Sequence, residues 1–219
     1  MAAEPGGSGR EAEQSPVVFY YDLSSPYSYL AAERINSLFA EPPRWQPISF
    51  GFLLRATGKV PWSLRPGHEA DMREIERRAG ERGMQPLRWP EFWLRDPGDN
   101  PAEAPVATSY SLAAARAAIF AQQSGRVVAF SLAAFRQAFA AGRDLSDLDN
   151  VILAAAACEL HPKAVLKGIE TRAVKDRLRE ATEEAIERGV TGIPTVAVGE
   201  RLFWGDDRLE EAAQAAAAN

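Results

Sequence analysis

The sequence predicts an α/β protein whose two ends form one domain and whose middle is an all-helical insertion. Short runs of β-branched and aromatic residues bounded by turn residues, which are typical of strands, lie near the two ends of the chain. The long stretch between them is rich in alanine and has the apolar spacing of helices. The 219 residues are enough for one such domain with an insertion.

The first part of the chain has the order strand, helix, strand. Val17–Asp22 has the composition of a buried strand. Ser25 and Pro26 then supply an N-cap and a first helical residue, and we expect the helix to run to about Ala40. Arg44–Phe50 predicts a second strand, and the helix between the two strands favours parallel pairing.

Beyond the second strand, the pattern is helical as far as residue 170. We expect a charged helix over Met72–Arg82 and an irregular segment, rich in proline and tryptophan, over Gly83–Pro105. Four more helices are expected at Ser109–Gln123, Val127–Ala141, Leu145–Glu159 and Pro162–Lys167.

The last part of the chain has the order helix, strand, strand, helix. A helix is expected over Arg172–Arg188, and a hairpin joins strands at Thr195–Val198 and Arg201–Trp204. Asp206 or Asp207 is expected to cap the final helix. Joined to the opening segment, this is the element order of a thioredoxin-like fold. We therefore expect a disordered N-terminus over 1–15, a thioredoxin-like domain over 16–51 and 171–219, and an inserted helical domain over 52–170.

The charge composition argues against a nucleic-acid binder. The formal net charge is −5, whereas such proteins carry a basic excess. No apolar run is long enough to span a membrane, and the first fifteen residues lack the apolar run of a signal peptide, so we expect a cytoplasmic protein. Four arginines of the charged helix alternate with glutamates and favour a solvated helix face, namely Arg73, Arg77, Arg78 and Arg82.

Neither a protein disulfide nor a metal site is expected. Cys158 is the one cysteine in the sequence, and we expect its side chain to be buried and inert. The two histidines, His68 and His161, leave little material for a metal site or for a histidine-dependent nucleophile.

The segment after the first strand is the first candidate for chemistry. Ser25-Pro26-Tyr27-Ser28 opens a helix, where free backbone amides and the helix dipole stabilise a thiolate. Oxidoreductases of this fold carry Cys-x-x-Cys here, but this chain has serine at both positions. The Ser25 hydroxyl can donate a hydrogen bond to the thiolate of a bound molecule, or it can be a helix cap and nothing more.

Two later segments have matching features. Gly192-Ile193-Pro194-Thr195 places a proline directly before a strand, and in thioredoxin-like folds this proline is cis and lies beside the helix that carries the cysteines. We expect a cis Ile193–Pro194 bond near Ser25, although a proline can also simply open an edge strand. In Phe203–Leu209, a carboxylate and free amides suit the amino and carboxylate groups of a γ-glutamyl moiety.

Together these segments resemble one family. Tyr21–Leu30, Thr191–Thr195 and Leu202–Leu209 are similar to the 2-hydroxychromene-2-carboxylate isomerases and, more broadly, the kappa-class glutathione transferases. The resemblance implies glutathione, or another low-molecular-weight thiol, as cofactor and a small aromatic substrate. The residues implied to bind the thiol are Ser25, which contacts the sulfur, with Pro26, Tyr27, Ile193, Pro194, Trp204, Gly205, Asp206 and Asp207.

The same resemblance implies a substrate pocket and a reaction. Arg55 and Lys59 are candidates to bind the substrate carboxylate. The implied reaction converts 2-hydroxychromene-2-carboxylate to trans-benzylidenepyruvate by reversible thiol addition, in aromatic catabolism, and we expect a homodimer. A transferase acting on another electrophile and a non-catalytic thiol-binding module remain alternatives. Candidates for a flat aromatic pocket, or for insertion core, are Trp62, Trp89 and Phe92.

Overall fold

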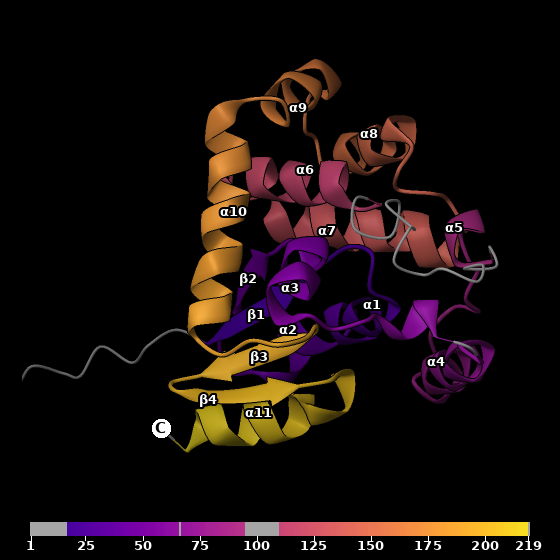
Figure 1. Ribbon diagram of the computed structural model, residues 1–219, viewed down its shortest axis with the longest axis vertical. Helices are drawn as coiled ribbons and strands as arrows, with labels where there is room; N and C mark the ends of the chain where they lie inside the picture. Colours follow the sequence, from indigo (N-terminus) through magenta and orange to yellow (C-terminus); the bar gives the residue numbers. More distant parts are fainter. Residues whose placement is uncertain (1–16, 66, 95–109, 219) are drawn as a thin grey trace, which may run out of the picture.

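The computed structural model describes residues 17–65, 67–94 and 110–218, and a four-stranded sheet lies below a group of helices (Figure 1). The sheet order is β2-β1-β3-β4. β1 pairs with β2 in parallel, and β3 and β4 form an antiparallel hairpin, both as predicted. β1 also pairs with β3 antiparallel, which joins the two ends of the chain in one sheet. The strands are β1 (Val18–Tyr21), β2 (Arg44–Pro47), β3 (Thr195–Val198) and β4 (Arg201–Trp204).

Some helices lie beside the sheet, and the others come from the middle of the chain (Figure 1). Those beside the sheet are α1 (Pro26–Ala32), α2 (Ile35–Leu38), α3 (Phe50–Thr57), α10 (Arg172–Glu187) and α11 (Leu209–Ala217), with the 3-10 helix η4 (Asp206–Arg208) before α11. Those of the middle of the chain are η1 (Trp62–Leu64), α4 (Glu69–Glu81), α5 (Glu91–Leu94), α6 (Leu112–Gln122), α7 (Val127–Phe135), the π-helix η3 (Arg136–Ala140), α8 (Leu148–Ala157) and α9 (Pro162–Gly168).

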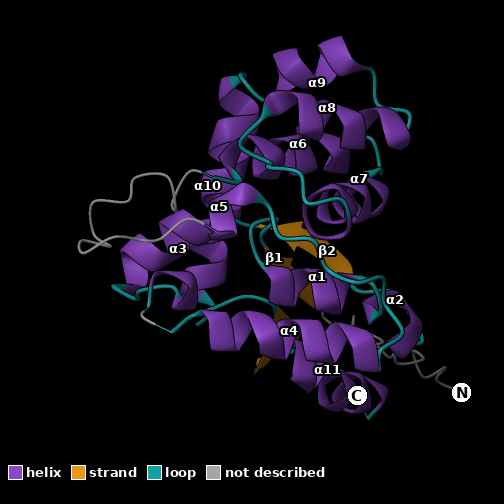
Figure 2. Cartoon of the chain, turned by 90° about the vertical axis from the view of Figure 1, so that its right-hand side faces the viewer, coloured by secondary structure: helices purple, strands orange, loops and turns teal. Residues whose placement is uncertain are grey.

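Each face of the sheet has its own core, because successive side chains of a strand point to opposite faces. Phe19 and Tyr21 of β1 belong to a large core with residues of α1, α7 and α11. Val18 and Tyr20 belong to a smaller core with residues of α3 and α10. α10 continues past the sheet to pack against α6, so it connects the helical group with the sheet (Figure 1). α4 passes alongside α1 (Figure 2).

Three local predictions were wrong. The expected second strand is shorter, because Ser49 caps α3 by accepting a hydrogen bond from Phe52 N at 3.3 Å, so the chain turns into a helix at residue 50. The expected first helix is broken at Arg34, whose side chain pairs with Glu210 of α11. Neither aspartate before α11 caps a helix with its side chain, since Gly205 and Arg208 occupy the cap positions.

Some expectations stay untested. Residues 1–15, which we expect to be disordered, lie outside the described residues. The part of the expected irregular segment that follows Leu94 lies outside them as well. The boundaries of the helical insertion at 52 and 170 stay predictions.

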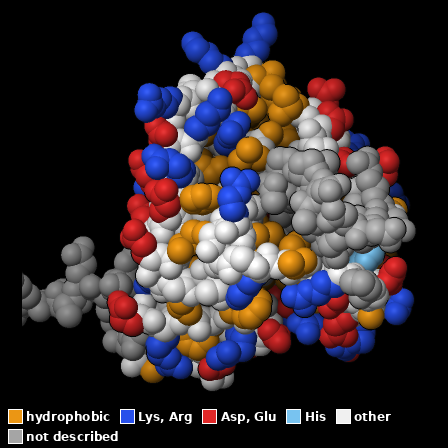
Figure 3. Space-filling model, viewed as in Figure 1, with side chains coloured by type: hydrophobic (Ala, Val, Ile, Leu, Met, Phe, Trp, Pro, Cys, Tyr) orange, Lys and Arg blue, Asp and Glu red, His pale blue; other side chains and the backbone are white. Residues whose placement is uncertain are grey.

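The surface of the described residues carries both charges. Lys and Arg side chains are interspersed with Asp and Glu around the rim of the face shown in Figure 3, in keeping with the mildly acidic composition. Within the described parts of the chain, no helix is long and apolar enough to cross a membrane. The same parts contain no group of three or more His, Cys, Asp or Glu side chains that could hold a metal ion.

Candidate functional site

A cavity of about 380 Å³ lies where the N-terminus of α1, the loop before β3 and the segment after β4 meet. Ser25 and the Ile193–Pro194 pair both line it, so the two segments singled out in the sequence lie on one cavity. The Ile193–Pro194 bond is cis, as predicted. Other residues of the lining come from the last turn of α4, from α3 and from the tryptophan-rich segment.

Ser25 is buried at the N-terminus of α1. Its Oγ accepts a hydrogen bond from Ser28 N at 3.1 Å and is therefore the N-cap of the helix. A hydroxyl that accepts in this way still has its own proton to donate. The cap role and the thiolate-binding role are therefore compatible.

Asp22 organises the turn that presents Ser25, a role that was not predicted. Its buried carboxylate accepts hydrogen bonds from Ser24 N at 2.8 Å, from Phe50 N at 2.7 Å and from the Ser111 hydroxyl. Ser25 N in turn donates to Asp22 O at 3.1 Å. One carboxylate thus joins the turn to the start of α3 and to the residue before α6. The sequence does contain a signal for this role, because Asp22 directly follows a buried strand and precedes Ser24 and Ser25 by two and three residues.

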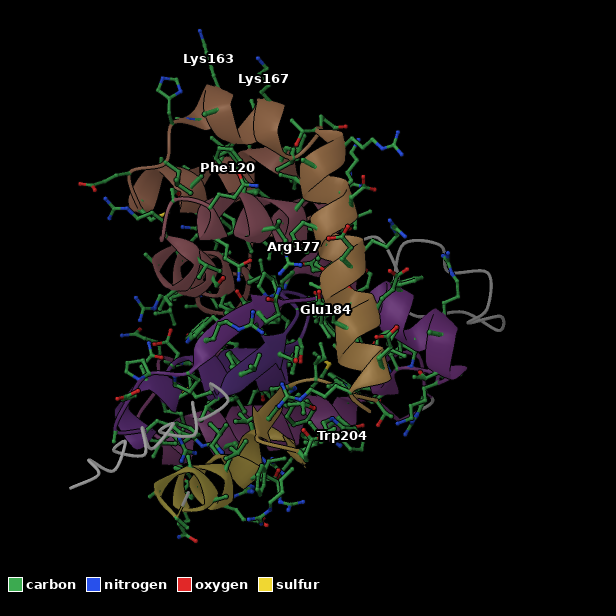
Figure 4. All side chains as sticks on the ribbon, turned by 90° about the vertical axis from the view of Figure 1, so that its left-hand side faces the viewer. Phe120, Lys163, Lys167, Arg177, Glu184 and Trp204 are labelled. Carbon is green, nitrogen blue, oxygen red and sulfur yellow. The ribbon has the colours of Figure 1, made fainter. Side chains whose placement is uncertain are left out.

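The loop before β3 is joined to the segment after β4. Gly205 N donates to Pro194 O at 2.9 Å. A Cβ at Gly192 would lie 2.5 Å from the Trp204 ring, so the indole packs directly on the glycine backbone. Trp204 is 58% exposed and lies near the end of α10 that adjoins the sheet, far from Lys163 and Lys167 of α9 (Figure 4).

Lys59 closes one edge of the cavity. Gly58, with φ +66°, ends α3 in the left-handed conformation and turns the chain toward the loop before β3. Lys59 Nζ then donates to Thr191 O at 3.1 Å and lies 5.0 Å from the centre of the Trp204 ring. Lys59 therefore lines the cavity, as expected for a ligand-binding side chain, and already has two partners there.

One wall of the cavity is aromatic. Tyr27 meets Trp62 edge to face at 6.0 Å, and Trp62 stacks on Trp93 at 5.1 Å with an angle of 16° between the rings. Phe92 meets Trp93 edge to face at 5.4 Å. These four side chains, here called the aromatic wall, offer apolar planar surface to a ligand. Trp93 was missed in the sequence, although it follows Phe92 directly.

The arginines of the charged helix do not all face solvent. Arg77 pairs with Glu74 and Glu81 on the exposed side of α4, as expected. Arg78 and Arg82 instead contact Asp206, with Nη1–Oδ1 and Nη2–Oδ2 distances of 2.7 Å each. The prediction of a solvated face was wrong for these two, because their partner lies more than 120 residues away and is 1% exposed.

Asp206 and Asp207 have different environments despite being neighbours. Asp206 is held by two arginines, whereas Asp207 is 62% exposed and lies 4.0 Å from Arg78 Nη1. Both line the cavity. Only Asp207 therefore offers a carboxylate that can rearrange around the amino group of a ligand.

Three candidate side chains lie outside the lining. Arg55 is exposed on α3, and Pro26 is buried as the first residue of α1. Trp89 lies behind the aromatic wall, where it meets Trp93 at 6.1 Å and its Nε1 donates to Glu76 at 2.6 Å. The lining instead contains two arginines that were not predicted, Arg65 and Arg78.

Cys158 lies apart from the cavity, at the end of α8. It is 5% exposed, and its Sγ is 3.2 Å from Ala155 O. This burial confirms the expected buried side chain, and it raises the pKa of the Cys158 thiol.

The fold and this site together define the class of the protein. The family of DSBA-like thioredoxin domains matches residues 16–217, and the chain belongs to that family. Its curated relatives include two proteins named 2-hydroxychromene-2-carboxylate isomerase. The one from Sphingobium xenophagum is 27% identical over 198 residues, covering 88% of this chain and 93% of the relative. The one from Pseudomonas putida is 28% identical over 200 residues, covering 88% and 90%.

Solved structures show the same fold. A 2-hydroxychromene-2-carboxylate isomerase structure superposes with a TM-score of 0.77 at 23% identity, covering 92% of this chain and 94% of the other. The cytosolic disulfide reductase DsbM from Pseudomonas aeruginosa, solved with GSH, has a TM-score of 0.57 at 16% identity, covering 92% and 96%. At these identities the likeness concerns the fold.

Proposed function

We propose that this protein is a glutathione-dependent isomerase that converts 2-hydroxychromene-2-carboxylate or a similar aromatic acid to its trans-benzylidenepyruvate. The observation that carries the proposal is one cavity lined by Ser25, the Ile193–Pro194 pair and the aromatic wall. The names of the curated relatives support the reaction type. The proposal includes a cytoplasmic homodimer, as expected from the sequence.

The residues around Ser25 fit a bound thiol. When bound, the thiol would supply a nucleophilic sulfur that adds reversibly to an unsaturated carbon of the substrate, so that the hemiketal ring can open and the former double bond can rotate as a single bond before elimination of the thiol restores the double bond in the trans isomer. The amides that open α1 and the Ser25 proton stabilise negative charge at that sulfur. The backbone of Ile193 is available to pair with the peptide of the thiol, and Asp207 to bind its amino group.

The aromatic part of the cavity fits a flat organic acid. The aromatic wall buries the rings of the substrate, and the cations of the lining attract its carboxylate. One cavity would hold the thiol and the aromatic acid side by side. Their reaction then becomes effectively unimolecular, and both reactants are oriented for it.

The experiment is a spectrophotometric assay of isomerisation with purified protein, with and without glutathione. We expect turnover with glutathione and none above background without it. Accumulation of a stable thiol adduct in place of the trans isomer would assign a transferase. Glutathione binding without any turnover would assign a binding module.

A further inference from the structure

Three basic side chains line the cavity within the described residues, and they differ in how they are held. Arg65 is exposed, and its Nη2 donates to Val60 O at 3.2 Å. Lys59 is exposed and held by Thr191 O and the Trp204 ring. The Arg78 side chain is 23% exposed. A charge withdrawn from water interacts more strongly with an ionic ligand than an exposed charge does.

Arg78 is also fixed in orientation. Its Nε donates to Glu74 at 2.8 Å and its Nη1 to Asp206 at 2.7 Å. Its Cζ lies 5.7 Å from the centre of the Tyr27 ring. Among the described residues, Nη2 donates to no partner. The guanidinium therefore has a fixed position, and one of its nitrogens has no partner in the described parts of the chain.

The two carboxylates that hold Arg78 are shared with other arginines. Asp206 carries one negative charge and is shared with Arg82, which lies outside the lining. Glu74 is likewise shared with Arg77. Each carboxylate that holds Arg78 is thus also paired with a second arginine, whereas Asp207, whose Oδ2 lies 4.0 Å from Arg78 Nη1, is exposed.

Arg78 lies at one end of the aromatic wall. The contacts run from Arg78 to Tyr27, from Tyr27 to Trp62 and from Trp62 to Trp93. A planar acid whose ring packs on this wall can direct its carboxylate to Arg78. We propose that Arg78 is the specificity-determining residue for the carboxylate of the aromatic substrate, and that Asp206 is the positioning residue that holds it. The identity of that substrate rests on the proposed function.

The test measures binding without any thiol, so that it does not depend on turnover. Isothermal titration calorimetry compares trans-o-hydroxybenzylidenepyruvate with its uncharged methyl ester, on wild type and on Arg78→Met. We expect wild type to bind the acid about tenfold or more tightly than the ester, as for the loss of one charge-assisted hydrogen bond. Arg78→Met should bind both about equally, with its affinity for the ester unchanged.

Three further variants complete the test. Arg77→Met removes an exposed arginine of the same helix and should keep the wild-type preference. Arg78→Lys keeps the charge and should retain part of the preference that Arg78→Met loses. Lys59→Met removes a second cation of the lining and should lose less of the preference than Arg78→Met does. Equal binding of acid and ester by wild type, no binding of either, or a preference that survives in Arg78→Met but is lost in Lys59→Met would each overturn the proposal.

A separate titration of wild type with glutathione distinguishes the two proposals. Absence of glutathione binding would contradict the proposed function. It would not affect the role of Arg78, which the binding of the acid and the ester tests without any thiol.

Discussion

Arg78 of α4 and Asp206 of η4, separated by 128 positions in the chain, form an ion pair with an Nη1–Oδ1 distance of 2.7 Å. Because Asp206 is 1% exposed and also contacts Arg82, this pair joins the charged helix to the segment after β4. One of the two aspartates expected to cap the final helix is thus part of a buried ionic cluster at the edge of the cavity.

Asp206→Asn should destabilise the protein by roughly 3 kcal/mol, because it leaves two partly buried arginines without their shared carboxylate. The matched control is Asp207→Asn, which changes an exposed neighbour and should alter the free energy of unfolding by less than about 0.5 kcal/mol. Urea unfolding of wild type, Asp206→Asn and Asp207→Asn measures both changes in the free energy of unfolding. A loss of only about 1 kcal/mol in Asp206→Asn, the usual effect of losing a cap, would contradict the ionic role.

Tyr29 should make stability depend on pH in the alkaline range. Burial, with a contribution from Glu33, raises the pKa of Tyr29 from 10.0 to about 12. The folded protein holds this proton more tightly than the unfolded chain, so its contribution to stability is complete below about pH 10 and is lost as the pH rises toward 12. Tyr29→Phe cannot titrate and should lose less stability than wild type across this range. Equal losses in urea unfolding at pH 9 to 11 would show that Tyr29 does not contribute.

Cys158→Ala should leave kcat/KM for isomerisation within about twofold of wild type, because a buried thiol with a raised pKa does not act as a nucleophile. Steady-state assays with saturating glutathione check this. A loss of several orders of magnitude in a variant with an unchanged circular dichroism spectrum would mean that a protein thiol takes part in the reaction.

Local signals in the sequence predicted the main features of the fold. The Ser25-Pro26 helix start and the Ile193-Pro194 strand start depend on backbone preferences of a few neighbouring residues, and both were located correctly. The same is true of the hairpin between β3 and β4. Errors arose where two local signals competed, as at Phe50, where the aromatic residue suits a strand but Ser49 caps a helix.

The arrangement of charged side chains could not be predicted in the same way. Arg78 and Arg77 are adjacent on one helix, and the helical period places them on different sides. Which side is buried depends on how α4 packs against the rest of the fold. Arg55 and Lys59 illustrate the same limit, because the end of α3 at Gly58 brings only Lys59 to the cavity.

Ser25→Ala should lower turnover near pH 7 by about ten- to a hundredfold, since one hydrogen bond to a charged group contributes roughly 1.5–3 kcal/mol. Much of the loss should be recovered at higher pH, where the thiol ionises without help. Thr171→Ala removes a comparable cap, at the start of α10, where Thr171 Oγ1 accepts from Val174 N at 3.3 Å. This control should lose stability without any change in the pH–rate profile.

The thiolate absorbance of bound glutathione as a function of pH, in wild type and Ser25→Ala, tests the central claim most directly. If the Ser25 hydroxyl donates to the sulfur, the apparent pKa of the bound thiol should be lower in wild type than in Ser25→Ala, and lower in both than in free glutathione. Identical titration curves for the two proteins would contradict the role of the hydroxyl and leave Ser25 as the cap of α1 alone.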